Sequence, residues 1–397
     1  MRIGLCLLLT FWCNVVLAVP PKLPRGMPPG QYDEEKVPEF NLPDPLVMLN
    51  GEKVNDVNTW KGKRRLEILE LFEKHVYGRT VIGRPHGMTS KVASEDRSGL
   101  NGRAIIKNVS IYFTAKTDGP RMNVNITLPV DAAKRPAPVF LIPGWGPDPQ
   151  ALIRRGYGLV TFNPWQIEPD TRQGSYEKSI RKVFSDPDQT RPERDEWGAI
   201  GAWAWGMSRA MDYIVTDADI DANKVCVFGF SRYGKTAMWA GAQDPRFAIV
   251  FSGQSGCGGQ VLVRRGFGET VKSMNGYAPH WFCGNFKSYN YRVNDLPVDW
   301  HMLIALIAPR PVYIAVAEED YWGDPRGSFL AAKDAEPVYK LFGKRGLEVN
   351  EMPPVEMPVG DFIGFHSRKG GHSITDYDWQ QFLSFADRHL GITKPPK

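Results

Sequence analysis

The stretch Val227-Phe228-Gly229-Phe230-Ser231-Arg232-Tyr233-Gly234-Lys235 places a serine between two glycines, directly after an apolar segment. Residues 225–228 are typical of a buried strand, and residues 234–242 are typical of a helix. A serine nucleophile on a sharp turn from strand to helix needs small neighbours, and the helix N-terminus stabilises negative charge beside it. The second glycine stands one position later than in the usual G-x-S-x-G motif. Ser231 is therefore our candidate nucleophile.

The segments around this turn alternate between strand and helix patterns. Alternating polarity predicts two half-exposed antiparallel strands, at 104–113 and 122–128. Continuous apolar runs predict buried parallel strands, at 137–142, 158–162, 247–251 and 311–316. Helical spacing predicts helices at 60–77, 197–215 and 378–390. In the first of these helices, one packing face is expected on or near Leu66, Ile68, Leu69, Leu71 and Phe72. The predicted fold class is α/β: an α/β-hydrolase three-layer sandwich, with a mostly parallel, doubly wound sheet flanked by helices.

In this fold the acid and the histidine of a catalytic triad follow the serine in that order. The last predicted strand is followed by Glu318, Glu319 and Asp320, where a carboxylate can orient an imidazole. Of the seven histidines, only His366 and His372 come after that strand without lying in a predicted helix, as His389 does, and His372 follows two glycines in a loop before the final helix. We predict Asp320 and His372 as the partners of the serine, and Glu319 stays open as an alternative acid.

The remaining composition argues against other kinds of chemistry. No H-E-x-x-H motif and no paired Cys/His spacing occurs, so we expect neither a metal nor a cofactor. A glycosidase needs two carboxylates and no serine turn. The formal net charge of +5 is spread over positions of mixed sign, which does not indicate nucleic acid binding but suits an acidic sugar polymer.

The N-terminus has the pattern of a secretory signal. Residues 1–18 combine Arg2, an apolar run and a small residue at Ala18, after which we expect cleavage. The apolar run is shorter than the ~20 residues that a membrane span needs. We expect a secreted or periplasmic monomer without a membrane anchor. Residues 19–45 predict an extended arm that carries no chemistry, and residues 46–397 a single catalytic domain.

Three of the five cysteines lie outside the predicted signal. Cys226 precedes the nucleophile in an apolar strand, which predicts a buried, inert thiol. Whether Cys257 and Cys283 pair stays open, because spacing alone does not decide it.

With these residues in place, the region from about residue 138 to residue 390 resembles the glucuronoyl esterases of the α/β-hydrolase superfamily, particularly their bacterial branch. These enzymes cleave the ester between lignin alcohols and 4-O-methyl-glucuronate on xylan. The resemblance rests on six motifs: Gly229-Phe230-Ser231-Arg232-Tyr233-Gly234-Lys235, Ser255-Gly256-Cys257-Gly258-Gly259, Gly268-Glu269-Thr270, Pro279-His280-Trp281-Phe282, Asp320-Tyr321-Trp322-Gly323-Asp324-Pro325-Arg326-Gly327 and Gly371-His372.

The resemblance implies a role for each matching residue. Ser231 attacks the ester carbonyl, His372 relays the proton and Asp320 orients the imidazole. Arg232 stabilises the oxyanion through its backbone N–H and its guanidinium. The sugar-binding positions of the family correspond to Lys235, Glu269 and Trp322. The implied substrates are glucuronoxylan and lignin-carbohydrate esters.

Two positions depart from the family pattern. Many members place their acid where Gln254 stands, and an amide cannot carry the charge that stabilises an imidazolium, so Asp320 must serve alone and Gln254 is predicted to be dispensable. Phe230 stands where fungal relatives have a disulfide-forming cysteine. Two alternative functions therefore stay open: an esterase for acetyl groups on xylan, and a carbohydrate-binding protein without catalytic activity.

Overall fold

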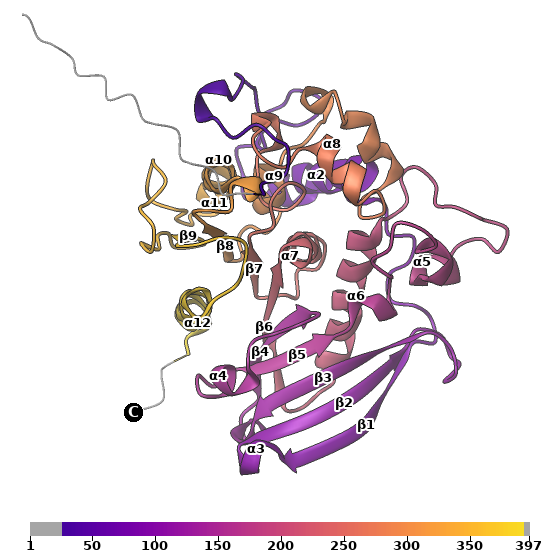
Figure 1. Cartoon of the computed structure of the whole chain (residues 1–397). Coiled ribbons are helices and arrows are strands. Elements are labelled where there is room, and N and C mark those ends of the chain that lie inside the picture. Colours follow the sequence, from indigo (N-terminus) through magenta and orange to yellow (C-terminus); the bar gives the residue numbers. More distant parts are fainter. Residues whose placement is uncertain (1–25, 393–397) are drawn as a thin grey trace, which may run out of the picture.

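The computed structural model describes residues 26–392, and the predicted signal peptide at residues 1–18 lies outside them. Nine strands form one sheet in the order β1-β2-β3-β5-β4-β6-β7-β8-β9 (Figure 1). The strands are β1 Thr89–Ser98, β2 Ala104–Tyr112, β3 Arg121–Pro129, β4 Ala137–Pro143, β5 Gly158–Phe162, β6 Ile220–Phe230, β7 Ile249–Gly253, β8 Val312–Ala317 and β9 Ile363–Arg368. Neighbouring strands from β5 across to β9 are parallel, and β1, β2, β3 and β5 pair antiparallel. The mostly parallel sheet confirms the predicted fold class.

Each predicted strand is present, but two strands of the sheet escaped prediction. All ten residues of β1 are exposed, so this strand has no apolar face to reveal it. In β9 every residue is buried, but half of the strand consists of the polar residues His366, Ser367 and Arg368. The strand therefore lacks the continuous apolar run by which buried strands were predicted. The imidazole of His366 bonds Tyr313 and Asp378 inside the protein, which excludes it from the triad.

Twelve α-helices lie within the described residues. Their bounds are α1 Val57–Thr59, α2 Arg65–Phe72, α3 Gly99–Gly102, α4 Pro149–Ile153, α5 Ile180–Val183, α6 Ala199–Ile214, α7 Arg232–Gln243, α8 Val271–Tyr277, α9 Trp300–Ala305, α10 Pro325–Asp334, α11 Glu336–Leu341 and α12 Asp376–Leu390. No helix within residues 26–392 is both long and apolar enough to cross a membrane.

The sheet separates two apolar cores, because successive side chains of a strand point to opposite faces. Phe140 of β4 packs in the core with residues of α4 and α12, whereas its neighbours Val139 and Leu141 pack in the core with α6, α7 and α9. Figure 1 shows α4 and α12 on one side of the sheet and α6 and α7 on the other. The three layers agree with the predicted sandwich.

The predicted helix at 60–77 is a composite. Two π-helical segments, residues 60–64 and 73–77, flank α2. Ile68 and Phe72 are buried as expected, but Leu66 is 52% exposed, so its assignment to the packing face was wrong. Leu66 and Ile68 both lie in the regular helix α2, where each residue turns the chain by about 100°, so positions two apart point to nearly opposite faces.

The described part of the N-terminal arm lies on the domain. The Gly268 N–H donates to the Gln31 carbonyl at 2.8 Å, and Arg265 pairs with Glu34 at 2.6 Å. Cys226, Cys257 and Cys283 are buried free thiols, so Cys257 and Cys283 do not pair in this structure. Burial raises the pKa of the Cys283 thiol to about 11, which makes it a poor nucleophile at neutral pH.

Candidate active site

Ser231 occupies the turn between β6 and α7. Its backbone is in a strained conformation, with φ 57° and ψ −124°. This conformation is stabilised by a hydrogen bond from the Ser231 N–H to the Gly253 carbonyl, at 2.8 Å. A Cβ atom on Gly229 would lie 1.8 Å from the Tyr233 carbonyl oxygen, so only glycine fits there. This turn has the geometry of a nucleophile elbow, which explains why a glycine stands two positions before Ser231.

The predicted triad partners come from two loops at the same end of the sheet. Asp320 follows β8 and His372 follows β9, and the His372 Nδ1 lies 2.8 Å from the Asp320 Oδ2. Asp320 is buried while Glu318 and Glu319 are exposed. Of the three candidate carboxylates, Asp320 is therefore the one that contacts the imidazole. The His372 side chain is 44% exposed, as a group that exchanges protons with substrate and water needs to be.

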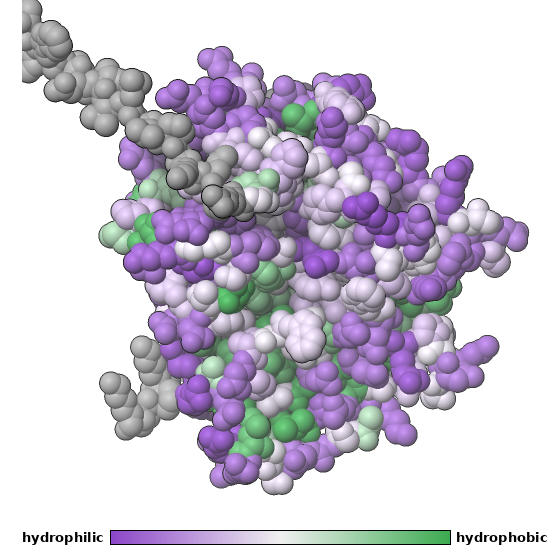
Figure 2. Space-filling view, viewed as in Figure 1, coloured by the Kyte–Doolittle hydropathy of each residue, from purple (hydrophilic) through white to green (hydrophobic). Residues whose placement is uncertain are grey.

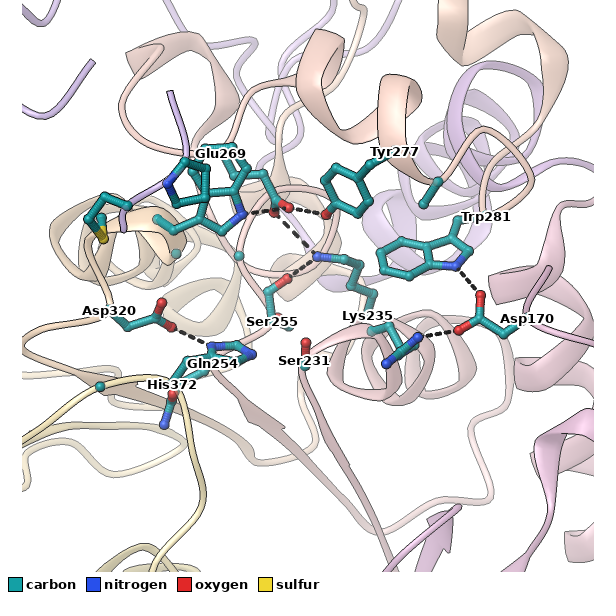
Figure 3. Close-up of a pocket in the computed structure, with 18 of the residues that line it drawn as sticks. Asp170, Ser231, Lys235, Gln254, Ser255, Glu269, Tyr277, Trp281, Asp320 and His372 are labelled. Carbon is teal, nitrogen blue, oxygen red and sulfur yellow. Dashed lines mark hydrogen bonds and ion pairs between the residues drawn. The ribbon is translucent and has the colours of Figure 1, made fainter. Parts of the chain in front are cut away.

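One cavity of about 690 Å³ brings the predicted residues together. Its lining includes all seven of them: Ser231, His372, Asp320, Arg232, Lys235, Glu269 and Trp322. In Figure 3, Ser231 and Lys235 lie between the Asp320–His372 pair and the Asp170–Trp281 pair. Within residues 26–392 the Ser231 hydroxyl makes no hydrogen bond, and catalytic hydrogen bonds often tighten only when substrate binds.

Arg232 is held by a carboxylate that the sequence analysis did not identify. Its guanidinium pairs with Asp170, which also accepts hydrogen bonds from the His280 Nε2 and the Trp281 Nε1, both at 2.7 Å. Burial alone would raise the pKa of Asp170, but these two hydrogen bonds and the positive charge of Arg232 hold the pKa below its usual range. A charged Asp170 keeps the guanidinium at the cavity, beside the first turn of α7.

The first N–H groups of α7 have no acceptor within the helix, because helix N-termini leave these donors unpaired. The N–H of Arg232 belongs to this group and lies directly after the nucleophile. Together with the guanidinium, it supplies the donor and the positive charge that an oxyanion requires. Within residues 26–392, no group of three His, Cys, Asp or Glu side chains could hold a metal ion.

Lys235 and Glu269 form a buried polar pair in the same cavity. The Lys235 ammonium donates to the Ser255 carbonyl at 2.5 Å and lies 3.6 Å from the Glu269 carboxylate. Glu269 also accepts hydrogen bonds from the Trp322 Nε1 at 3.2 Å, the Cys257 N–H at 3.1 Å and the Tyr277 hydroxyl. These groups are fixed in position by one another, so they present a rigid polar surface to a ligand.

Gln254 contacts the histidine loop instead of the imidazole. Its Nε2 donates to the Ser373 carbonyl at 2.5 Å, and its Oε1 accepts from the Ser373 N–H at 3.0 Å. Arg368 donates to the carbonyls of Gly371 and Ser373, which lie on either side of His372. The loop on both sides of His372 is therefore held by side chains, which gives Gln254 a contact that the prediction of its dispensability did not consider.

Several residues of the cavity could not be assigned to the site from the sequence. Asp170 and Arg172 lie in an irregular segment between β5 and α6, far in sequence from the nucleophile. His280 and Trp281 stood within a recognised motif, but that motif did not reveal their contact with Asp170. Met27 and Pro28 of the arm also line the cavity, so the arm forms part of the site wall.

Comparisons with known proteins agree with this geometry. A family model described as glucuronyl esterase of fungi matches residues 111–343. A carbohydrate esterase of an unknown prokaryotic organism is 42% identical over 92% of this chain and 93% of its own length. The chain belongs to the glucuronoyl esterase family. It is accordingly a carboxylic ester hydrolase with an α/β-hydrolase fold.

Other members support this assignment. The structure of a glucuronoyl esterase from Solibacter usitatus has a TM-score of 0.86 and 42% identity, covering 90% of this chain and 100% of that one. A 4-O-methyl-glucuronoyl methylesterase of Wolfiporia cocos is 35% identical over 82% of this chain and 79% of its own length. Glucuronoyl esterases of both bacteria and fungi are thus similar to this chain.

Proposed function

We propose that this chain hydrolyses the ester between 4-O-methyl-glucuronate of glucuronoxylan and lignin alcohols. The observation that carries the proposal is one cavity in which Ser231 and the His372–Asp320 pair face the buried Lys235–Glu269 pair. The first group supports ester cleavage, and the second supports recognition of a hydroxylated sugar.

The first step forms a glucuronoyl-enzyme ester. The Ser231 oxygen attacks the ester carbonyl carbon while its proton passes to the His372 Nε2. Asp320 accepts a hydrogen bond from the Nδ1 side of the ring and stabilises the imidazolium. The Arg232 N–H and guanidinium stabilise the tetrahedral oxyanion. The bond to the alcohol then breaks, and the alcohol leaves with the proton from His372.

The second step releases the sugar acid. His372 takes a proton from water, and the resulting hydroxide attacks the acyl carbon. The tetrahedral intermediate collapses with cleavage of the bond to the Ser231 oxygen, which recovers its proton from His372. No cofactor enters either step.

The polar wall of the cavity supports a uronate as the acyl group. Lys235 and Glu269 form an ion pair at 3.6 Å, and the Trp322 Nε1 donates to Glu269 at 3.2 Å, so an ammonium, a carboxylate and an indole meet on this wall. An ammonium and an indole N–H can donate to hydroxyl and methoxyl oxygens, and a carboxylate can accept from hydroxyls. An acetyl group has none of these partners, so it would leave this wall unused.

A pair of serine variants tests the proposal. Ser231→Ala is expected to abolish hydrolysis of benzyl glucuronate, whereas Ser384→Ala, an exposed position on α12, should retain full activity. A serine-directed phosphonate should label the native enzyme and the Ser384 variant but not the Ser231 variant. An unlabelled native enzyme would instead support a carbohydrate-binding protein without catalysis.

A comparison of acyl groups tests the choice of substrate. Glucuronoyl and acetyl esters of the same alcohol are assayed side by side, and the glucuronoyl ester is expected to have the higher kcat/KM. A preference for the acetyl ester would support the acetylxylan alternative. We also propose that the protein is secreted or periplasmic and acts as a monomer, which fractionation and sedimentation would test.

A further inference from the structure

A second groove lies next to the active site. It has a volume of about 330 Å³ and is bounded by the loop after β4, the end of β6 and the start of α12. Its large apolar side chains are those of Trp145, Phe228, Phe230, Ile374 and Trp379. Figure 2 shows hydrophobic residues at the surface in the lower half of this face, the area in which Figure 1 places α4 and β4, whereas the upper half is mostly hydrophilic. The groove thus differs in chemistry from the catalytic cavity.

Trp145 is the least covered aromatic residue of the groove. It is 97% exposed, although the indole is among the side chains that gain most from contact with other groups. The preceding Gly144 lies against Tyr233 of α7, because a Cβ atom there would be 3.1 Å from the Tyr233 ring. The loop that carries Trp145 therefore borders the nucleophile turn.

Phe230 connects the groove to the catalytic machinery. Its ring lies 4.6 Å from the His372 ring, centroid to centroid, at an interplanar angle of 37°. Phe230 immediately precedes Ser231, and Ile374 follows His372 by two positions. One aromatic ring therefore separates the groove from the group that donates a proton to the leaving alcohol.

The linings on the two sides of His372 differ in kind. The catalytic cavity is lined by charged side chains of both signs, among them Lys235 and Glu269, whereas the groove combines four aromatic rings with only two charged residues, Asp148 and Asp376. The uronate carboxyl is uncharged in the ester, but the sugar carries several hydroxyls, which find few hydrogen-bond partners on an apolar wall. A neutral aromatic ring can stack on Trp145, and a phenolic hydroxyl can donate to a carboxylate.

We propose that this groove binds the aromatic ring of the alcohol half of the substrate, and that Trp145 determines the preference for aromatic alcohols. The inference rests on the proposed function and adds the location of the leaving group. The sugar half of the ester occupies the polar cavity, the ester bond lies at Ser231 and His372, and the ring of the alcohol extends across Phe230 onto Trp145.

The test compares benzyl and methyl esters of 4-O-methyl-glucuronate, which share the acyl group and differ in the alcohol. For Trp145→Ala we expect kcat/KM to fall about five- to tenfold with the benzyl ester, the range expected from losing one aromatic contact. The methyl ester should change less than about twofold, since it has no ring to stack. Trp145→Phe should retain most of the benzyl preference.

Tyr291→Ala is the matched control, because Tyr291 is 80% exposed and lines neither cavity. It should leave the ratio of the two kcat/KM values unchanged. Equal losses with both esters in Trp145→Ala, or no loss with either, would overturn the proposal. Because Trp145 is almost fully exposed, a failure of the variant to fold is not expected, and a thermal melt checks it.

A failure of the proposed function gives a different result. If the native enzyme hydrolyses acetyl esters but not glucuronoyl esters, the acyl assignment is wrong while the groove remains testable. Benzyl acetate and methyl acetate then replace the glucuronoyl pair. A selective loss of benzyl acetate hydrolysis in Trp145→Ala would support the groove alone, and an unchanged ratio would reject it.

Discussion

The side chain of Gln254 pairs with the backbone of Ser373 through two hydrogen bonds, one from its Nε2 to the Ser373 carbonyl and one to its Oε1 from the Ser373 N–H. The pair holds the residue directly after His372, and Gln254 itself adopts a positive φ of 47° to make it. A glutamine in a position that many family members give to the acid thus fixes the histidine loop instead.

Gln254→Ala should lower kcat, because the loop that positions His372 loses both contacts. We expect a decrease of about tenfold, the scale of a small misplacement of a catalytic group, with little change in KM. Gln254→Glu can still accept from the Ser373 N–H but cannot donate to its carbonyl, so it should recover only part of the rate. Steady-state kinetics on benzyl glucuronate measures both. An Ala variant with native kcat would show that Arg368 alone holds the loop.

Asp320→Asn should be far more damaging than the Gln254 variants. The carboxylate holds the ring of His372 in its orientation and stabilises its charge, and loss of a triad acid in another family costs about 10⁴-fold in kcat. Glu319→Gln is the matched control, since Glu319 is the exposed neighbour and should tolerate the change. If Glu319→Gln proves the more damaging of the two, the acid assignment is wrong.

Asp170→Asn should reduce kcat by up to about 10²-fold, because Arg232 loses the partner that keeps its guanidinium near the oxyanion. The depressed pKa of Asp170 also links it to stability. A carboxyl whose pKa is lower in the folded state stabilises the protein above its unfolded pKa, and this stabilisation is lost as the pH falls through the folded pKa.

Urea unfolding between neutral and acidic pH tests that linkage. The native enzyme should lose stability in acid more steeply than Asp170→Asn, whose amide does not titrate. Asp118→Asn, at an exposed loop position, should retain the native slope. Identical slopes for all three proteins would mean that Asp170 has an ordinary pKa in the folded state.

Gly229→Ala should destabilise the fold and abolish activity together. Its new methyl group would meet the Tyr233 carbonyl at 1.8 Å, and backbone atoms cannot rotate away, so we expect a loss of about 3 kcal/mol in unfolding free energy. Gly276→Ala in α8 meets no atom within 4 Å and should be neutral or stabilising. Thermal melts of both variants measure the difference, and a stable Gly229 variant would contradict the close packing of this turn.

Local patterns in the chain were sufficient for much of the fold. The parallel strands are buried on both faces, so each of them is a continuous run of apolar residues that can be recognised in the sequence. The strand β1 could not be found this way, because all its residues are exposed and only pairing with β2 defines it. Leu66 was misplaced because two residues that are two positions apart in a regular helix, such as Leu66 and Ile68, point to nearly opposite faces.

The sequence by itself determined the nucleophile turn, since a glycine, a serine and a second glycine between a strand and a helix are a requirement of local geometry. It also narrowed the acid to three adjacent carboxylates. Only the tertiary structure decided that Asp320 contacts His372, that Asp170 holds Arg232 and that Gln254 holds Ser373. The reason is physical: each of these contacts joins residues more than fifty positions apart, and the packing of loops at one end of the sheet brings them together.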